Sequence, residues 1–314
     1  MNWNLNKIIV EENSNLPLDW NSMSRSGRVF VEIGFGNGEH LAFLAKKYPD
    51  VLIVGVEVSQ LCVLKGARLA LAEGLDNIRV MHGDARFLLR AMFAPETVDR
   101  LFMNFPCPWP KTRHAERRVT VPSFARLLNY LLKTGGTFEL ATDVDWYAEE
   151  AKETITETGA FDTVSFEKNP QREYVTKYER LWLSMGKDIW SVALQKNGRV
   201  PHDNRTLFAD EWETEREVDT EMKLEQLLTK IKGAEGKGTN GEGYWTYRDV
   251  FLSDERVALG LLITADEGFE QHFYIKFVEK SSGGITVKVD SVGHPYRTPA
   301  MRAALKYALD AAQK

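Results

Sequence analysis

RVFVEIGFGNGEH, residues 28–40, is the stretch of sequence that decides the fold. It begins with a short run rich in Val, Phe and Ile, which is the pattern of a buried strand. A glycine-rich turn follows, and residues 41–49, LAFLAKKYP, then have the spacing of an amphipathic helix that ends at Pro49. Glycines in such a turn let backbone N–H groups approach a ligand at the N-terminus of the helix. The stretch therefore predicts a strand, a ligand-binding loop and a helix in succession.

The same alternation continues along the chain. Apolar runs at residues 51–58, 77–82 and 98–104 also predict strands, and residues 59–75 have helical spacing. Alternating strands and helices are typical of a parallel sheet, in which ligands bind at the carboxyl ends of the strands. The predicted strand ends carry these notable residues: Gly34, Glu57, Asp84 and Asn104. We therefore expect an α/β domain with a ligand site at one edge of its sheet.

The loop and the acidic residues around it indicate which cofactor binds. The loop glycines have the spacing G-x-G-x-G, without the extra residue of the dinucleotide motif G-x-G-x-x-G: Gly34, Gly36 and Gly38. Glu57 can accept hydrogen bonds from ribose hydroxyls in an NAD or an S-adenosylmethionine enzyme. Asp84 suits the exocyclic amine of adenine, and Glu32 suits a cationic sulfonium and ammonium group. We therefore expect S-adenosylmethionine, with NAD and a generic turn as the alternatives.

A second stretch, NFPCPWPKTRHAERR at residues 104–118, combines rigidity with positive charge. Its three prolines exclude a helix interior, because each lacks a backbone N–H group. Lys111 and Arg113 can bind phosphates, and Trp109 can stack on a base or anchor the loop. The net charge of the chain is −5, so a polyanion would have to bind such a local patch. The alternative is a solvated basic face.

Six motifs together resemble bacterial tRNA (guanine-N7)-methyltransferases across roughly residues 28–196. They occur in the family's order: EIGFGNGEHL, GVEVS, GDAR, NFPCPWPKTRHAERRV, ATDVDWYAEEA and YVTKYER. The proline-tryptophan-basic run and the T-K-Y-E run are the most specific. The resemblance implies a class I Rossmann-like methyltransferase sheet with helices on both faces. It also implies S-adenosylmethionine as cofactor, tRNA as partner, and methylation of the guanosine at position 46 of the variable loop.

The resemblance assigns residues to two groups. The cofactor-binding group is Glu32, Gly34, Gly36, Gly38, Glu57, Asp84, Asn104 and Cys107. The substrate-binding group is Lys111, Arg113, Asp143, Thr176, Lys177, Tyr178 and Glu179. A glutamate can accept from both N1–H and the 2-amino group of guanine, so we expect Glu179 to select the base. Asp143 competes for this role, and a surface salt bridge from Glu179 to Lys177 or Arg180 is the structural alternative.

Cys107 departs from the family pattern, which has Asp between the two prolines. In the family, that Asp is the candidate catalytic residue. At this position we expect Cys107 either to contact the site directly or to be a small loop residue that packs. Guanine N7 carries a lone pair and no proton, so it needs no base to attack a methyl group. Two other functions stay open: a non-catalytic RNA-binding relative, and a methyltransferase with another substrate, since N-F-P-C loosely echoes N-P-P-Y loops.

The remaining sequence predicts the domain organisation. We expect a methyltransferase domain over residues 1–198, a charged helical connector and linker over 199–243, and a small α+β accessory domain over 244–314. The accessory domain contains four predicted strands and a final helix that starts near Pro299. Its basic residues can line an RNA-facing surface, and a stabilising or dimerising module is the alternative: Lys276, Lys280, Lys288 and Arg297.

Bulk composition excludes several classes of protein. No stretch of the 314 residues is long and apolar enough to span a bilayer, and the N-terminus has no apolar signal core. Cys62 and Cys107 are the only cysteines, too few for a disulfide framework or a cysteine-rich zinc site. We therefore expect a cytoplasmic monomer or homodimer without a bound metal.

Overall fold

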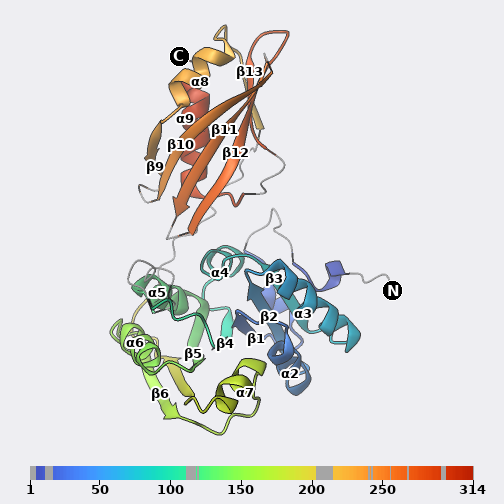
Figure 1. The fold of residues 1–314 in the computed structure, drawn as a ribbon, viewed down its shortest axis with the longest axis vertical. Coiled ribbons are helices and arrows are strands. Elements are labelled where there is room, and N and C mark those ends of the chain that lie inside the picture. The colour runs from blue at the N-terminus through green and yellow to red at the C-terminus, as the bar shows by residue number, and fades with distance from the viewer. Residues whose placement is uncertain are drawn as a thin grey trace. The chain divides into compact units, whose positions relative to one another are not determined.

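A computed structural model divides the chain into two compact units, Met1–Arg205 and Thr206–Lys314 (Figure 1). The structure describes residues 5–10, 17–110, 118, 120–202, 215–239, 241, 243–254, 256–266, 269–290 and 295–313. Within these ranges, no helix is both long and apolar enough to cross a membrane.

The first unit is built on a seven-stranded sheet with the order β3-β2-β1-β4-β5-β7-β6. Its strands are β1 (Val29–Ile33), β2 (Leu52–Glu57), β3 (Ile78–His82), β4 (Val98–Asn104), β5 (Leu132–Thr142), β6 (Phe161–Lys168) and β7 (Trp190–Lys196). Strands β1 to β5 pair in parallel, whereas β7 runs antiparallel to both β5 and β6. The strand order reverses between β1 and β4, and in sheets of this type ligands bind at the carboxyl ends of the strands beside that point. The predicted α/β class is confirmed.

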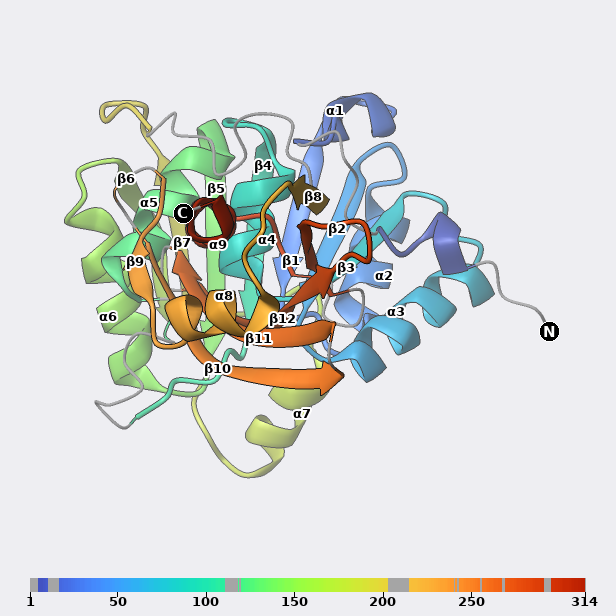
Figure 2. The same ribbon diagram turned by 90° about the horizontal axis from the view of Figure 1, so that it is seen from above.

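Helices cover both faces of this sheet (Figures 1 and 2). Helices α2 (Glu39–Lys47) and α3 (Gln60–Ala72) bury one face in a core that includes Phe30, Ile53 and Phe102. The neighbouring residues in β1, Val29 and Val31, are also fully buried, so the opposite face is covered too. That cover comes from α4 (Ala85–Met92), α5 (Pro122–Leu131) and α6 (Asp145–Thr156). Burial on both faces explains why the strands are continuous apolar runs.

Three short elements complete the first unit. They are a 3₁₀ turn at Leu5–Lys7, α1 (Trp20–Met23) and α7 (Lys177–Ser184). Helix α7 lies in the connection between β6 and β7. Because Glu179 is the buried residue of α7, this helix is held by a polar side chain and not by an apolar face.

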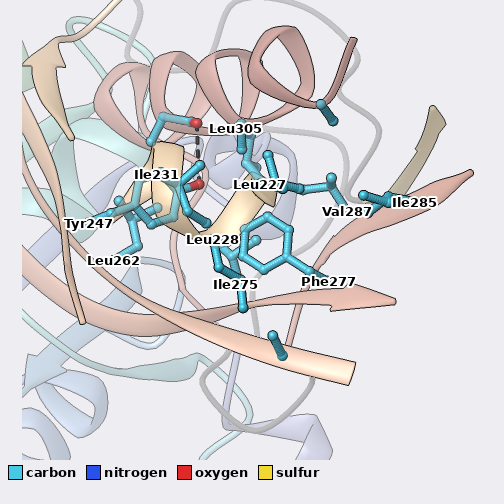
Figure 3. Close-up of a cluster of buried hydrophobic side chains, with 14 of the residues drawn as sticks. Leu227, Leu228, Ile231, Tyr247, Leu262, Ile275, Phe277, Ile285, Val287 and Leu305 are labelled. Atoms are coloured by element: carbon cyan, nitrogen blue, oxygen red, sulfur yellow. Dashed lines mark hydrogen bonds between the residues drawn. The ribbon is translucent and has the colours of Figure 1, made fainter. Parts of the chain in front are cut away.

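The second unit is a six-stranded antiparallel sheet with the order β8-β13-β12-β11-β10-β9. Its elements are β8 (Glu215–Val218), α8 (Leu224–Ile231), β9 (Glu235–Lys237), β10 (Tyr244–Asp254), β11 (Val257–Asp266), β12 (Phe269–Glu279), β13 (Ile285–Val289) and α9 (Pro299–Gln313). Figure 3 shows Tyr247, Phe277 and Leu305 in the core between the sheet and its helices. The buried Tyr247 hydroxyl donates a hydrogen bond to the Ala304 carbonyl at 3.2 Å, and burial raises the pKa of Tyr247.

The structure differs from the expected connector over residues 199–243. Residues 215–218, 224–231 and 235–237 contribute β8, α8 and β9 to the second unit. Leu224, Leu227 and Ile231 are buried in its core, and their spacing places them on one face of α8. The charged residues in and beside α8, Lys223, Glu225 and Lys230, are exposed to solvent. The overall composition of the segment is therefore polar, although one face of the helix is apolar. The accessory unit therefore starts before Tyr244, and residues 203–214 lie outside the described residues.

Candidate active site

The glycine loop between β1 and α2 is shaped by positive backbone angles. The φ angles of Gly34, Gly36 and Gly38 are 71°, 56° and 85°, a region that glycine adopts without steric cost. A Cβ atom on Gly34 or Gly36 would meet no heavy atom within 4 Å, so open space borders this backbone. A Cβ atom on Gly38 would lie only 2.8 Å from Gly66 Cα in α3. The loop is therefore open toward a ligand and closely packed against the helix behind it.

Glu57, at the end of β2, is held against this loop. Its Oε2 accepts a hydrogen bond from the Gly36 N–H at 3.1 Å, and its Oε1 accepts one from the Ser59 N–H at 3.0 Å. The carboxylate is only partly buried. Glu57, which the sequence places at the end of a strand, therefore lies beside the glycine loop with its carboxylate held in place.

Glu32 presents a second carboxylate, which is buried with 2% exposure. Its Oε1 accepts a hydrogen bond from the Asn104 side-chain amide at 3.0 Å, and His40 Nδ1 lies 3.1 Å away. Its Oε2 is buried and has no hydrogen-bond partner among the described residues. Because an unsatisfied buried acceptor is costly, this oxygen suits a donor or cation supplied by a ligand. Sequence reasoning identified Glu32 and Asn104 but missed His40.

Asp84 already has a partner in its own helix. It is the N-cap of α4, accepts from the Arg86 backbone N–H at 2.9 Å, and accepts from the Arg86 guanidinium at 2.6 and 3.1 Å. The side-chain hydrogen bonds to Asp84 raise the pKa of the Arg86 guanidinium above its usual value. A ligand amine at Asp84 would therefore share the carboxylate with Arg86, a partner that the strand-end argument did not include.

The loop after β4 carries two non-glycine residues with positive φ, Phe105 at 54° and Trp109 at 42°. The Phe105 N–H donates to the Ala141 carbonyl at 2.7 Å, and Cys107 between them is exposed. The Trp109 carbonyl accepts two hydrogen bonds of 3.1 Å from the Arg118 guanidinium. Cys107 is thus displayed on a loop that is pinned at both ends, and it is not a packed core residue.

Arg118 differs from the free cation that the basic run suggests. Its side chain is 14% exposed and pairs with Glu150 of α6 at 3.2 Å. Its guanidinium also lies 5.1 Å from the centre of the Trp146 ring. This member of the run therefore anchors the loop to α6. Lys111 and Arg113 lie outside the described residues.

The expected substrate residues occupy different environments. The Asp143 side chain, 14% exposed, accepts from Lys187 Nζ at 2.5 Å. Thr176 caps α7, where its hydroxyl accepts from the Glu179 N–H at 3.2 Å and the Glu179 carboxylate accepts from the Thr176 N–H at 3.3 Å. Lys177 and Tyr178 are exposed on the same turn. The capping box thus fixes where α7 begins.

Glu179 is buried with 3% exposure, so the alternative of a surface salt bridge to Lys177 or Arg180 is wrong. Its carboxylate pairs with Arg172 at 2.6 Å. Arg172 lies outside the six motifs on which the family resemblance is based, and no local sequence pattern indicates a role for it. Tyr174 from the same segment packs against Phe43 of α2 with ring centres 4.9 Å apart, and burial raises its pKa.

Comparison with known proteins gives concordant matches. Residues 26–192 match a family described as "Putative methyltransferase". A tRNA (guanine-N(7)-)-methyltransferase of Thermotoga maritima is 36% identical over 92% of this chain and 91% of the relative. The chain belongs to the tRNA (guanine-N7)-methyltransferase family. Relatives of the same name from Thermus thermophilus and Aquifex aeolicus are 32% and 30% identical, over 91% and 88% of this chain and 89% and 91% of each relative.

The second unit is also part of what these family members share. A match that covers 91% or 92% of this chain must include most of Thr206–Lys314. Within that unit, Lys276 of β12 and Lys288 of β13 stand directly opposite each other, whereas Lys280 pairs with Glu217. Lys280, one of the four residues of the expected basic surface, is therefore engaged in an ion pair.

Proposed function

We propose that this chain transfers the methyl group of S-adenosylmethionine to N7 of the guanosine at position 46 in the tRNA variable loop. The observation that carries the proposal is the meeting of two sets of acidic groups at one sheet edge. Glu32 and Glu57 adjoin the glycine loop, and Glu179 connects to the end of β4 through Arg172 and Asn104. Membership of a tRNA-methylating family agrees with this chemistry. Because tRNA is the substrate, the cytoplasm is the proposed compartment.

The described residues fit this cofactor. The unpartnered Glu32 Oε2 suits a cationic group, and the fixed Glu57 carboxylate suits ribose hydroxyls. The open space beside Gly34 and Gly36 leaves room for a ligand against the backbone. When bound, S-adenosylmethionine supplies an electrophilic methyl group on a sulfonium centre. Glu32, Glu57, the glycine loop and Asn104 would hold it, and Asp84 would contribute alongside Arg86.

The protein's main contribution to this reaction is placement. Guanine N7 has an in-plane lone pair, so the chain needs no general base to create the nucleophile. It must hold N7 within about 3–3.5 Å of the methyl carbon and in line with the bond that breaks. The guanine ring becomes cationic on methylation, and a nearby carboxylate stabilises that charge. Glu179 and Asp143 are the residues we assign to this side of the site.

Cys107 is compatible with such a reaction. It occupies the position of the family's Asp, and its exposed place on the anchored loop gives it access to a substrate. A carboxylate there would add a graded electrostatic stabilisation, not an obligatory proton transfer. The loss of that charge therefore reduces the rate without removing the chemistry.

The test uses the full chain, an unmodified tRNA transcript and tritiated S-adenosylmethionine. After incubation, borohydride and aniline cleave RNA at 7-methylguanosine. We expect incorporation of label and a single cut at position 46, and neither in a matched transcript with adenosine there. Absence of both transfer and cleavage with the unaltered transcript would overturn the proposed function and favour a non-catalytic RNA-binding relative.

A further inference from the structure

Arg172 connects two separate parts of the candidate active site. It lies in the segment between β6 and α7, and its side chain is 17% exposed. One guanidinium nitrogen, Nη2, donates to Asn104 Oδ1 at 2.5 Å, and the other, Nη1, donates to Glu179 Oε2 at 2.6 Å. The planar fork of arginine can hold two acceptors in fixed directions at once.

The chain of contacts continues from Asn104 to the cofactor side of the site. Because Asn104 Oδ1 accepts from Arg172, its amide nitrogen is left to donate to Glu32 Oε1 at 3.0 Å. A polar series therefore runs from Glu32 through Asn104 and Arg172 to Glu179. Its two ends are buried carboxylates with 2% and 3% exposure. We call these four residues the Arg172 bridge.

The bridge also touches the loop that carries Cys107. The Arg172 guanidinium lies 6.0 Å from the centre of the Phe105 ring, at the start of that loop. Phe105 has a φ of 54°, so its side-chain direction depends on an unusual backbone conformation. The Arg172 side chain thus contacts Asn104 on the cofactor side, Phe105 in the Cys107 loop and the buried Glu179 of α7.

We propose that Arg172 is a positioning residue that couples cofactor binding to guanine recognition. This inference rests on the function proposed above. A ligand cation at Glu32 fixes Asn104, Asn104 fixes Arg172, and Arg172 orients the Glu179 carboxylate toward the base. The coupling is reciprocal, so tRNA strengthens cofactor binding by the same factor. Arg172 itself contacts neither the transferred methyl group nor N7.

The experiment measures binding of S-adenosylhomocysteine by calorimetry, with and without tRNA. This product cannot react, so affinity is separated from turnover. For the wild-type chain we expect tRNA to tighten its binding about five- to tenfold, at the low end of typical couplings. In R172A the factor should fall below about twofold, and kcat/KM for tRNA should fall about 10- to 100-fold.

Two further variants separate positioning from folding. R172K keeps the charge but cannot span both acceptors, so it should restore kcat/KM only in part and leave coupling low. R180A is the matched control, because Arg180 is 56% exposed and its pair with Glu39 is 3.4 Å long. It should keep both coupling and kcat/KM. Melting temperatures within a few degrees of wild type for R172K and R180A would show intact folding.

The failures of the two proposals are distinguishable. Wild-type protein that methylates N7 but shows no coupling, or R172A with wild-type coupling, overturns the role of Arg172 and leaves the methyltransferase function standing. Wild-type protein that gives no cleavage at position 46 overturns the function itself. Full rescue by R172K of both coupling and kcat/KM would show that charge alone is needed, which also contradicts the bridge.

Discussion

Replacing Gly38 by alanine tests how closely the glycine loop packs against α3. The residue has a φ of 85°, and a Cβ atom there would lie 2.8 Å from Gly66 Cα, which is backbone. The left-handed conformation costs an alanine about 1–2 kcal/mol. The contact must also lengthen by about 0.6 Å to reach the 3.4 Å of ordinary van der Waals contact, and such overpacking costs about 1–3 kcal/mol.

Gly74 at the end of α3 provides the matched control. It has a φ of 66°, but a Cβ atom there would meet no heavy atom within 4 Å. Gly74→Ala should therefore show only the conformational cost of about 1–2 kcal/mol. The expected excess for Gly38→Ala, about 1–3 kcal/mol, isolates the close approach of loop and helix.

Scanning calorimetry of the full chain and titration with S-adenosylhomocysteine are the two assays. At about 2–4 °C per kcal/mol for a unit of this size, Gly38→Ala should lower Tm by roughly 4–20 °C, and Gly74→Ala by roughly 2–8 °C. Gly38→Ala should also weaken cofactor binding, because the displaced loop carries the Gly36 N–H that holds Glu57. Equal losses of stability in the two variants, with unchanged affinity in both, would refute the reasoning.

Three other variants address the Cys107 loop, the basic run and the core. Cys107→Asp should leave kcat level or raise it, and a large loss of kcat would show that the thiol has a role of its own. Lys111→Ala with Arg113→Ala should reduce the slope of log affinity for tRNA against log salt by about one to two, whereas an unchanged slope would move the RNA-binding surface elsewhere. Lys196 is 2% exposed and donates to two backbone carbonyl groups at the end of α5, so Lys196→Met should destabilise the first unit by about 2–4 kcal/mol in calorimetry. The hydrogen bond from Lys196 also lowers the pKa of Glu96, so this pair stabilises the fold above the unfolded-state pKa of a glutamate. The stabilisation is lost as the pH falls through the lowered folded-state pKa of Glu96. Lys196→Met should lack this pH-dependent part of the stability.

The parallel half of the sheet could be predicted because its information is local. Each buried strand is a continuous apolar run, and the residue that ends it lies at the carboxyl edge by geometry alone. Gly36 and Glu57 are 21 residues apart in sequence, yet adjacent parallel strands bring them into contact. The capping box of Thr176 and Glu179 is also a local four-residue pattern, although the family resemblance assigns these two residues only a substrate-binding role.

The parts that sequence reasoning missed depend on distant partners. Arg172 contacts Asn104, 68 residues away, and His40 lies beside Glu32 only after α2 folds back on the sheet. The sequence suggests that Arg118 is a free cation, but in the fold it forms an ion pair with Glu150 of α6. The composition of the segment before Tyr244 predicts a connector, because its charged residues outnumber the few leucines that enter the core. For Arg172, His40 and Arg118 the deciding interaction is tertiary and leaves no local pattern, whereas α8 carries a short amphipathic pattern that the surrounding charges outweigh.

The identity of the methylated atom tests the central claim most directly. The full chain is incubated with S-adenosylmethionine carrying an isotopically labelled methyl group and an unmodified tRNA transcript. The RNA is then digested to nucleosides, which are identified by chromatography and mass spectrometry. The account predicts that the label appears in 7-methylguanosine, and label in any other nucleoside, or in none, would contradict it.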